Sequence, residues 1–270
     1  MYKILNNFYK SNIFDKLPKV LARKLFKIFK IFFVETNLVT LPENNHPTKL
    51  DKDLQLKIIK NQNDKFYRPF STCSYLLEIL TLYSKSQKNL SFFDFGANNI
   101  DNFIYLNRYL KNWQYIYYDL PHYNDIISNL IKEKELKNIT VSQDLSLGEK
   151  PLDFVFFGSS LHYTNDYKEI LKKFFHNKTK NIILSHTPFY TSNKNKNDIV
   201  LKQVNIHPII NYAYLIQYDN FINFMKNNNY ILVSQNKNNL IKFLNFKNFS
   251  DDFSFINFLD LTFSYQTNNS

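Results

Sequence analysis

Two acids stand 25 residues apart, and each ends an apolar, strand-like run. Asp94 ends "SFFD" and is followed by Phe95 and Gly96, while Asp119 ends "QYIYYD". If the two runs are strands of one parallel sheet, both acids lie at its carboxyl edge, where open α/β sheets bind ligands. A carboxylate there can accept hydrogen bonds from two neighbouring hydroxyl groups, such as a ribose diol, and it repels a phosphate. The spacing therefore predicts a site for a nucleoside without a phosphate on its ribose.

The turn after the first acid is poor in glycine. It reads "DFGANN", with one glycine where the dinucleotide-binding pattern G-x-G-x-x-G has three. Those glycines let the backbone approach a pyrophosphate, so their absence argues against NAD and against P-loop nucleotides. S-adenosylmethionine carries adenosine, no phosphate and a zwitterionic amino acid end, and it needs fewer glycines at this turn. The turn therefore favours S-adenosylmethionine among the common cofactors.

The elements that must position these residues alternate along the chain. Alternation of strands with helices of 10–15 residues predicts βαβ units and a mostly parallel sheet, an α/β fold. After residue 218 we expect one more helix and then two strands, joined as a hairpin at "NKNN", residues 236–239. The expected strands before that point are 91–95, 114–121, 138–145, 151–160 and 180–189, and the expected helices are 70–86, 100–112, 125–136 and 167–177.

Three short motifs give a resemblance. In order along the chain they read "FDFGA", "GSSLHY" and "HTP". They resemble the "LDFGG", "SGxLQY" and "RTP" segments of class I S-adenosylmethionine-dependent methyltransferases from a family often associated with bacterial surface-polysaccharide gene clusters. The resemblance covers roughly residues 65–235. In this chain Ala97 replaces the second glycine, His162 replaces the glutamine and His186 replaces the arginine.

The resemblance implies a fold and a division of the chain. The implied fold is a Rossmann-like sheet of seven strands, mostly parallel with an antiparallel last strand. Residues 66–270 would form the methyltransferase domain, and residues 1–65 a basic, amphipathic helical extension with a linker. The implied cofactor is S-adenosylmethionine, bound by Asp94, Phe95, Gly96, Asp119, Asp144 and Ser159.

Each of these residues has a second interpretation. Asp94 would hold the amino acid end of the cofactor and Asp119 its ribose diol, but strand-end acids also cap helices. Asp144 would accept from the adenine amino group, or it would have only a structural role. Ser159 would leave room beside the sulfonium, or it would simply form a turn. The sequence leaves these alternatives open.

His162 and His186 are the candidate catalytic residues. Each lies at the carboxyl end of an expected central strand, and the two strands are adjacent, so both can face one pocket. A hydroxyl acceptor must lose its proton during methyl transfer, and an imidazole has a suitable pKa for a general base. Of the two, we expect His186 to be the base. The alternative is that either ring is a buried, hydrogen-bonded structural histidine.

The basic charge is concentrated at the start of the chain. The net charge is +11, of which residues 1–34 carry +7, with eight Lys or Arg against Asp15 alone. Within residues 16–34, apolar residues recur at three- and four-residue steps, which predicts an amphipathic helix. Its apolar face comprises Leu17, Leu21, Leu25, Phe29 and Phe32. Such a helix either contacts an anionic membrane or packs on the domain with its lysines in solvent.

Composition excludes several functions. Cys73 is the single cysteine, and the six histidines show no HExxH spacing, so we expect no disulfide framework and no metal site. The remaining chain carries only +4, which argues against nucleic acid as a partner. No stretch resembles a signal peptide or is long and apolar enough to span a bilayer, so we expect a cytoplasmic protein, with peripheral contact to the inner membrane as an option.

Two functions follow. The first is an S-adenosylmethionine-dependent methyltransferase that acts on a small molecule or on a precursor of a surface polysaccharide such as capsule or O-antigen, most simply by O-methylation. The second is a catalytically silent α/β module that binds a membrane or a partner enzyme through its basic helix. The paired acids Asp94 and Asp119 favour the first. The methyl acceptor and the oligomeric state are left open.

Overall fold

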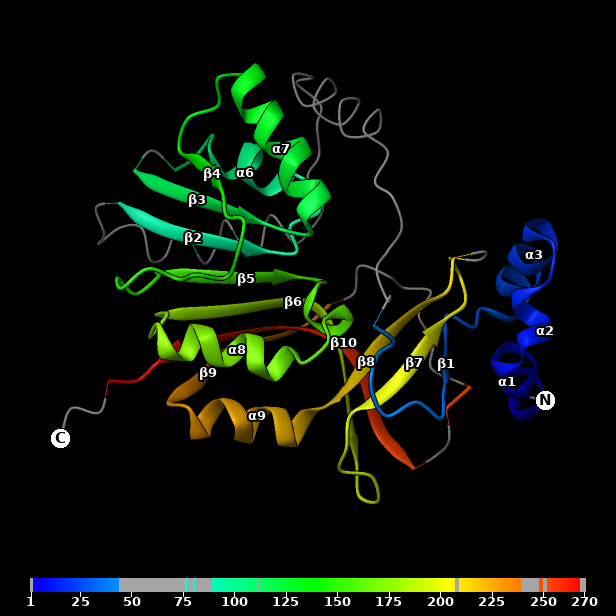
Figure 1. The fold of residues 1–270 in the computed structure, drawn as a ribbon. Coiled ribbons are helices and arrows are strands. Elements are labelled where there is room, and N and C mark those ends of the chain that lie inside the picture. Colours follow the sequence, from blue (N-terminus) through cyan, green and yellow to red (C-terminus); the bar gives the residue numbers. More distant parts are fainter. Residues whose placement is uncertain are drawn as a thin grey trace.

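The structure is a computed structural model, and it describes residues 2–43, 76, 80, 89–110, 112–206, 209–238, 248–249 and 252–267. Seven strands form the main sheet in the order β4-β3-β2-β5-β6-β10-β9, which runs from top to bottom in Figure 1. Their bounds are β2 Leu90–Phe95, β3 Trp113–Tyr118, β4 Ile139–Val141, β5 Phe154–Gly158, β6 Asn181–Ser192, β9 Tyr230–Lys237 and β10 Phe253–Tyr265.

The direction of the strands confirms the expected fold class. Strands β4, β3, β2, β5 and β6 pair in parallel, whereas β10 pairs antiparallel with both β6 and β9. The sheet is therefore a Rossmann-like sheet with an antiparallel last strand in the chain. The carboxyl ends of β2, β3, β5 and the parallel half of β6 meet at one edge.

Alternation along each strand separates two cores. On β2, Phe92 packs with the helices α6 (Asp101–Leu106) and α7 (Pro121–Glu133). Its neighbour Phe93 packs on the other side with α8 (Tyr167–His176) and α9 (Tyr218–Asn227). Both faces of the sheet are covered by helices, which explains the nearly continuous apolar runs of its central strands.

A three-stranded antiparallel unit extends the sheet. The distal half of β6 pairs with β8 (Asn211–Gln217), β8 pairs with β7 (Ile199–Gln203), and β7 pairs with β1 (Phe33–Glu35). A short 3₁₀ helix, η1 (Leu161–Tyr163), lies against β8 and β6. The sequence analysis had no strand at β8.

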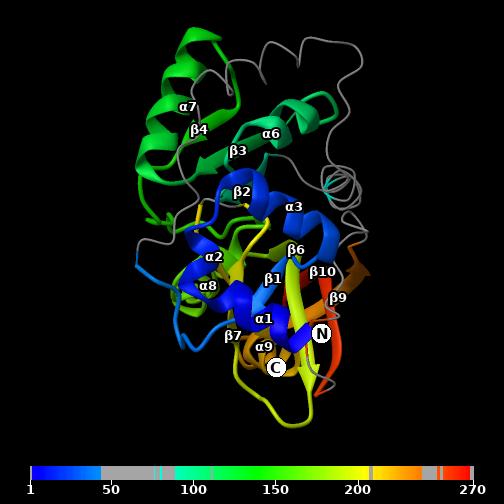
Figure 2. The same ribbon diagram turned by 90° about the vertical axis from the view of Figure 1, so that its right-hand side faces the viewer.

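Three helices precede β1 and cover the outer side of this unit (Figure 2). They are α1 (Tyr2–Lys10), α2 (Asn12–Asp15) and α3 (Lys19–Phe29). The helix predicted over 16–34 is shorter, because Pro18 precedes it and Lys30 ends it in the left-handed conformation. Residues 33–35 form a strand instead, so this part of the extension is continuous with the sheet.

The apolar face of α3 packs inward. Leu17, Leu25 and Phe29 contact a buried cluster that contains Tyr9, Phe14, Ala22, Ile31, Val34 and Val204. A buried ion pair ties the helices to β7, because Lys202 Nζ lies 2.5 Å from Asp15 Oδ1. The structure thus supports the packing interpretation for most of the predicted apolar face.

Several further expectations lie partly or wholly outside the described residues. The antiparallel partner of β9 is β10, and the second strand predicted after "NKNN" lies outside the described residues. The linker at 44–65 and most of the predicted helix at 70–86 also lie outside them; Leu76 and Leu80 are described, and both are helical and buried. Over the part of the chain that the structure describes, no helix could cross a membrane.

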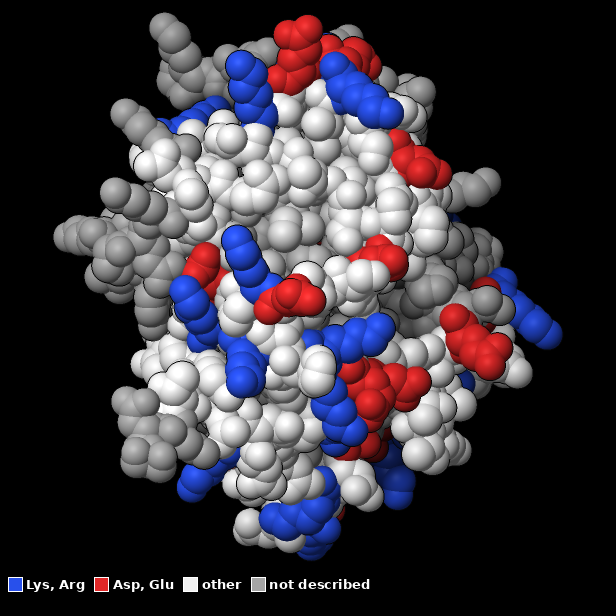
Figure 3. All heavy atoms as spheres, turned by 60° about the vertical axis from the view of Figure 1, so that its left-hand side comes forward, with Lys and Arg blue, Asp and Glu red and all other residues white. Residues whose placement is uncertain are grey.

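Charges of both signs mix on the surface. On the face drawn in Figure 3, Lys and Arg side chains lie among Asp and Glu side chains. This face therefore lacks the uniformly positive charge that would attract a polyanion such as a nucleic acid.

Candidate active site

The turn after β2 uses two left-handed residues. Gly96 has φ 65° and Asn98 has φ 59°. Both Gly96 and Ala97 donate their N–H groups to the carbonyl oxygen of Tyr118 at the end of β3, at 2.8 and 3.3 Å. Asparagine is one of the few residues that tolerates the left-handed region, so Asn98 stands where a second glycine would otherwise be needed. This explains how the turn forms with a single glycine.

Gly96 is also required by its neighbour. A Cβ atom on Gly96 would lie 2.6 Å from Cβ of Ser160, which follows β5. The Ser160 hydroxyl donates to the carbonyl oxygen of Phe95 at 2.7 Å and so joins the ends of β2 and β5. The Phe95 ring packs on Tyr118 and Phe157 in the core, so only the backbone of Phe95 is available to a ligand.

Asp119 binds the same turn. Its Oδ2 accepts from the N–H of Asn98 at 2.6 Å and its Oδ1 from the N–H of Leu120 at 2.7 Å. Burial raises its pKa, and the hydrogen bonds from Leu120 and Asn98 oppose this shift. No side chain caps the start of α7, so the capping interpretation does not apply there. Each oxygen retains a lone pair for a further donor.

Asp94 is buried, with 1% of its surface exposed. Its Oδ2 accepts from Nδ2 of Asn102 at 2.9 Å and from the hydroxyl of Tyr115. Its Oδ1 has no partner, and neither has the nearby Tyr117 hydroxyl. Burial raises the pKa of Asp94 to about 7, against the hydrogen bonds from Asn102 and Tyr115. Because Asn102 is in α6, Asp94 does bond to the next helix. Its Oδ1 has no partner among the described residues, so this oxygen can accept a hydrogen bond from a ligand.

His186 lies inside β6, because the strand continues to Ser192, beyond the carboxyl end that the sequence analysis expected near His186. Its backbone is left-handed, with φ 51°, and a register shift in β10 lies opposite. The ring stacks on Phe258 with centroids 4.2 Å apart. The Asn238 side chain, which donates to Asp260, lies near the ring, and Nδ1 is buried with no partner among the described residues. Burial lowers the pKa of His186, so the neutral imidazole prevails near neutral pH.

His162 faces the same phenylalanine from η1. Its ring centroid lies 6.2 Å from that of Phe258, and only 1% of the residue is exposed. Neither ring nitrogen has a hydrogen-bond partner in the part of the chain that the structure describes. Burial and the proximity of His186 hold the pKa of His162 well below its usual range. A structural histidine normally has its nitrogens satisfied, so the two free nitrogens point to an absent polar group.

Ser159 belongs to this group of residues, and Asp144 does not. Ser159 has φ 61° and donates its N–H to the carbonyl oxygen of Ser185 at 2.9 Å. Together with Gly96, Asn98 and His186 it gives four left-handed residues, at the ends of β2 and β5 and within β6, a concentration typical of functional sites. Asp144 is exposed and accepts from the N–H of Ser146, which lowers its pKa.

Two cavities lie away from these residues. One of about 790 Å³ lies between residues 145–149 and α8. The other, of about 430 Å³, lies at the far end of β6 beside Ser192 and Asp198. Neither is lined by Asp94, Asp119 or the two histidines, so the case for a site rests on the strand ends and their unpartnered atoms.

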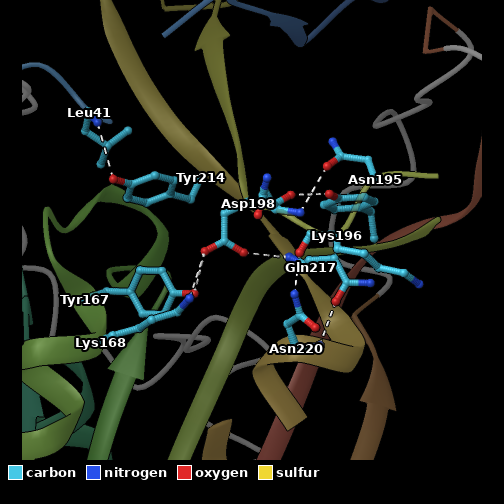
Figure 4. A network of polar contacts seen from close by, with 11 residues as sticks. Leu41, Tyr167, Lys168, Asn195, Lys196, Asp198, Tyr214, Gln217 and Asn220 are labelled. Atoms are coloured by element: carbon cyan, nitrogen blue, oxygen red, sulfur yellow. Dashed lines mark hydrogen bonds and ion pairs between the residues drawn. The ribbon is translucent and has the colours of Figure 1, made fainter. Parts of the chain in front are cut away.

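A polar network fixes the appended strands beside the site (Figure 4). Asp198 Oδ2 accepts from the Tyr167 hydroxyl at 2.8 Å, and its Oδ1 accepts from the N–H of Gln217 at 2.9 Å. Lys168 lies 3.6 Å from the same carboxylate. The loop between β6 and β7 is thereby held to the starts of α8 and α9, which keeps β7 and β8 over η1.

Comparisons with known proteins agree with this fold. No family model and no curated protein matches the chain. Solved structures of the N-terminal domain of EvdMO1 are similar. The one obtained in the presence of SAH and D-fucose has a TM-score of 0.53 and 9% identity, and the match covers 80% of this chain and 98% of that domain. The one with SAH bound has a TM-score of 0.52 and 8% identity, covering 93% and 99%.

The chain has the fold of class I S-adenosylmethionine-dependent methyltransferases. A methyltransferase of this kind from Clostridium acetobutylicum has a TM-score of 0.49 and 10% identity, covering 80% of this chain and all of that one. At identities near 10% such similarities show the fold alone. They do not support membership of the polysaccharide-associated family, so the ligand of the site is inferred from its own residues.

Sequence reasoning missed several residues of this edge. Asn98, Asn102 and Tyr115 complete the hydrogen bonds of the two acids, and Asn238 and Asp260 surround His186. A signal existed for Asp260, because it is the one charged residue inside the apolar run "FINFLDLTF". Asn238 carried no signal in a chain so rich in asparagine.

Proposed function

We propose that this protein is an S-adenosylmethionine-dependent methyltransferase. The observation that carries the proposal is the convergence of Asp94, Gly96 and Asp119 at one strand edge, with an unpartnered oxygen on Asp94. Asp119 has lone pairs for the ribose diol, and Asp94 for the ammonium of the amino acid end, directly or through water. The turn with Gly96 lets the backbone approach the ligand. The donor set therefore fits the cofactor, which would supply an electrophilic methyl group on its sulfonium.

The acceptor chemistry follows from the histidines. His186 is the proposed general base, with His162 as the alternative, because burial lowers the pKa of both rings and each has a buried nitrogen with no partner among the described residues. A neutral imidazole can remove the proton of a hydroxyl acceptor, so O-methylation is the proposed reaction. A small molecule or a surface-polysaccharide precursor is the proposed acceptor. The motif resemblance supports it, as does the sugar present with the similar EvdMO1 domain.

Binding of S-adenosylhomocysteine, the product of the cofactor, tests the proposal without knowledge of the acceptor. Isothermal titration calorimetry on the full chain should detect binding. Asp119→Asn should weaken it about 10- to 100-fold, because a hydrogen bond to a charged group contributes about 1.5–3 kcal/mol. Asp125→Asn, an exposed acid on α7, is the matched control and should bind as the unchanged chain does. Absence of binding, or equal affinities in both variants, would refute the proposal.

The cellular site of the reaction is also part of the proposal. We place the reaction in the cytoplasm, with the outward side of α3 touching the inner membrane. Val20, Leu21 and Ile28 remain exposed on α3, and they lie among the lysines of the same helix. Basic residues beside exposed aliphatic residues suit an anionic bilayer surface.

A further inference from the structure

The hydroxyl group of Tyr117 is buried beside the turn without a hydrogen bond. The residue is 0% exposed, and its hydroxyl has no partner among the described residues. Oδ1 of Asp94 is in the same state. A buried polar atom without a partner costs free energy of folding, so such atoms in a native protein call for an explanation. A donor and an acceptor left over on neighbouring strands point to a polar ligand.

Tyr117 and Asp94 are neighbours on one face of the sheet. They are paired in register between the parallel strands β3 and β2. Tyr117 packs in the same cluster as Phe92, and residues 92 and 94 share a face of β2. Tyr115 is paired with Phe92, yet its hydroxyl donates to Asp94, so a tyrosine of this face reaches toward the carboxyl edge. The charges of Asp119 and Asp94 both act on the Tyr117 hydroxyl, which agrees with a position between these two acids.

The turn after β2 has no N–H group to spare for a negatively charged group of a ligand. The N–H groups of residues 96–99 all have acceptors, which are the carbonyl oxygens of Tyr118 and Ala97 and the carboxylate of Asp119. Asp94 and Asp119 would also repel a second anion at this edge. A ligand that carries a carboxylate here therefore needs a donor from a side chain.

Tyr117 can supply that donor. Burial raises the pKa of Tyr117, and the charges of Asp119 and Asp94 raise it further, so the hydroxyl keeps its proton at neutral pH. The Tyr115 hydroxyl on the same strand is already used by Asp94.

We propose that Tyr117 is a cofactor-binding residue whose hydroxyl donates, directly or through water, to the carboxylate at the amino acid end of S-adenosylmethionine. The inference rests on the proposed function, in which Asp94 accepts from the ammonium of the same end. Ammonium and carboxylate are attached to one carbon atom, so the side chains that bind them must be neighbours, as Asp94 and Tyr117 are. An acceptor-only carboxylate beside a neutral hydroxyl donor thus matches both charges of the zwitterion.

The test compares two ligands by isothermal titration calorimetry on the full chain. They are S-adenosylhomocysteine and its decarboxylated form, which keeps the adenosine and the ammonium. Tyr117→Phe should bind S-adenosylhomocysteine about 10- to 100-fold more weakly, because a hydrogen bond to a charged group is lost. Its affinity for the decarboxylated form should stay within about twofold of that of the unchanged chain, since this ligand lacks the other end of the same hydrogen bond. Tyr109→Phe, at an exposed tyrosine, is the control and should bind both ligands as the unchanged chain does.

Thermal unfolding without ligand gives a second measurement. Tyr117→Phe should not lower the midpoint, because its hydroxyl has no partner to lose. Tyr115→Phe should lower the midpoint, because Asp94 loses a donor. A lower midpoint for Tyr117→Phe would mean that the hydroxyl is already bonded within the chain, and it would overturn the inference.

The binding results separate this inference from the proposed function. Equal weakening of both ligands in Tyr117→Phe, or an unchanged affinity for S-adenosylhomocysteine, overturns the inference and leaves the proposed function in place. So does an unchanged chain that binds the decarboxylated form at least as tightly as S-adenosylhomocysteine, and this measurement needs no variant. If the unchanged chain binds neither ligand, the proposed function fails and the inference fails with it.

Discussion

At the scale of single residues, Asp94 combines burial with an incomplete set of hydrogen bonds. A carboxyl group with a folded-state pKa of about 7 is protonated over much of the range in which the unfolded chain is ionised. A ligand that brings an ammonium group changes this balance, because it favours the charged form. The acid would therefore couple cofactor binding to the release of a proton.

The first prediction follows from that coupling. Affinity for S-adenosylmethionine should rise as the pH increases from about 5 to about 7, by up to about tenfold per pH unit, and then level off. Calorimetry in buffers of different ionisation enthalpy should show proton release below pH 7. Asp94→Asn should remove the pH dependence and weaken binding at pH 8. A pH-independent affinity in the unchanged chain would exclude Asp94 as the ammonium partner.

Asp94 should also make the free energy of unfolding depend on pH. Its pKa is raised on folding, so the folded state holds a proton that the unfolded state has lost between about pH 4 and about pH 7. Without ligand, the contribution of Asp94 to the free energy of unfolding is thus present at low pH and declines as the pH rises through this window. The cofactor would stabilise the charged form of Asp94, which burial disfavours in the protein without ligand.

Gly96 gives the second prediction. Gly96→Ala should lower the free energy of unfolding by about 1–3 kcal/mol and weaken cofactor binding, because φ is 65° and the added Cβ would meet Ser160 at 2.6 Å. Gly148→Ala is the control, since nothing lies within 4 Å of its added Cβ. Urea denaturation followed by circular dichroism measures both. Equal stability of the two variants would show that the turn relaxes without cost.

At the scale of elements, the N-terminal helices are held by one buried ion pair as well as by apolar packing. The side chains of Lys202 and Asp15 are 6% and 20% exposed, and the ammonium group also lies 5.8 Å from the Phe14 ring. Removal of one partner leaves the other charge buried and uncompensated, which costs more than the pair itself contributes.

The third prediction concerns this pair. Asp15→Ala should reduce the free energy of unfolding by about 3–5 kcal/mol, and adding Lys202→Met should restore most of it. Glu169→Ala breaks the exposed pair with Lys172 and should change stability by no more than about 0.5 kcal/mol. Denaturant titration of the unchanged chain and these three variants provides the comparison. If the double variant is no more stable than Asp15→Ala, the loss comes from packing and not from the unpaired lysine.

The elements also show what the sequence could and could not predict. The strands that carry Asp94 and Asp119 were predictable, because apolar runs ending in acids alternate with helical periodicity. Strand β8 was missed although "NYAYLIQ" is apolar and pairs antiparallel with the preceding strand β7, with Gln203 opposite Asn211; its other partner is the distal half of β6. The bulge at His186 is fixed by Asp260, 74 residues later, and no local pattern announces it.

The candidate site was predictable to the same degree. Asp94, Gly96 and Asp119 lie at strand ends, where position follows from topology, and the structure brings them together. Asp144 follows a strand too, but Ser146 draws its carboxylate into a local turn at the surface.

At the scale of the whole molecule, the N-terminal helices and the strand edge belong to one structure. The apolar residues of α3 nearest the body pack on Tyr9 and Phe14, so the helix is oriented by the fold. The helical period of 3.6 residues then determines which residues of α3 point outward. It holds Val20 and Ile28, each 68% exposed, with Lys24 and Lys27 between them.

The fourth prediction tests whether this outward side meets a membrane. The full chain should co-sediment with vesicles that contain anionic phosphatidylserine, and less so with neutral vesicles or at high salt. Lys24→Glu with Lys27→Glu should weaken binding about 30-fold or more, since each basic residue near the surface contributes about 1 kcal/mol. Lys132→Glu with Lys137→Glu makes the same change in net charge on the opposite part of the molecule, so it should have a much smaller effect. Equal losses in both variants would mean that net charge alone drives the attraction. No sedimentation of the unchanged chain would leave α3 as a packing element whose lysines only face solvent.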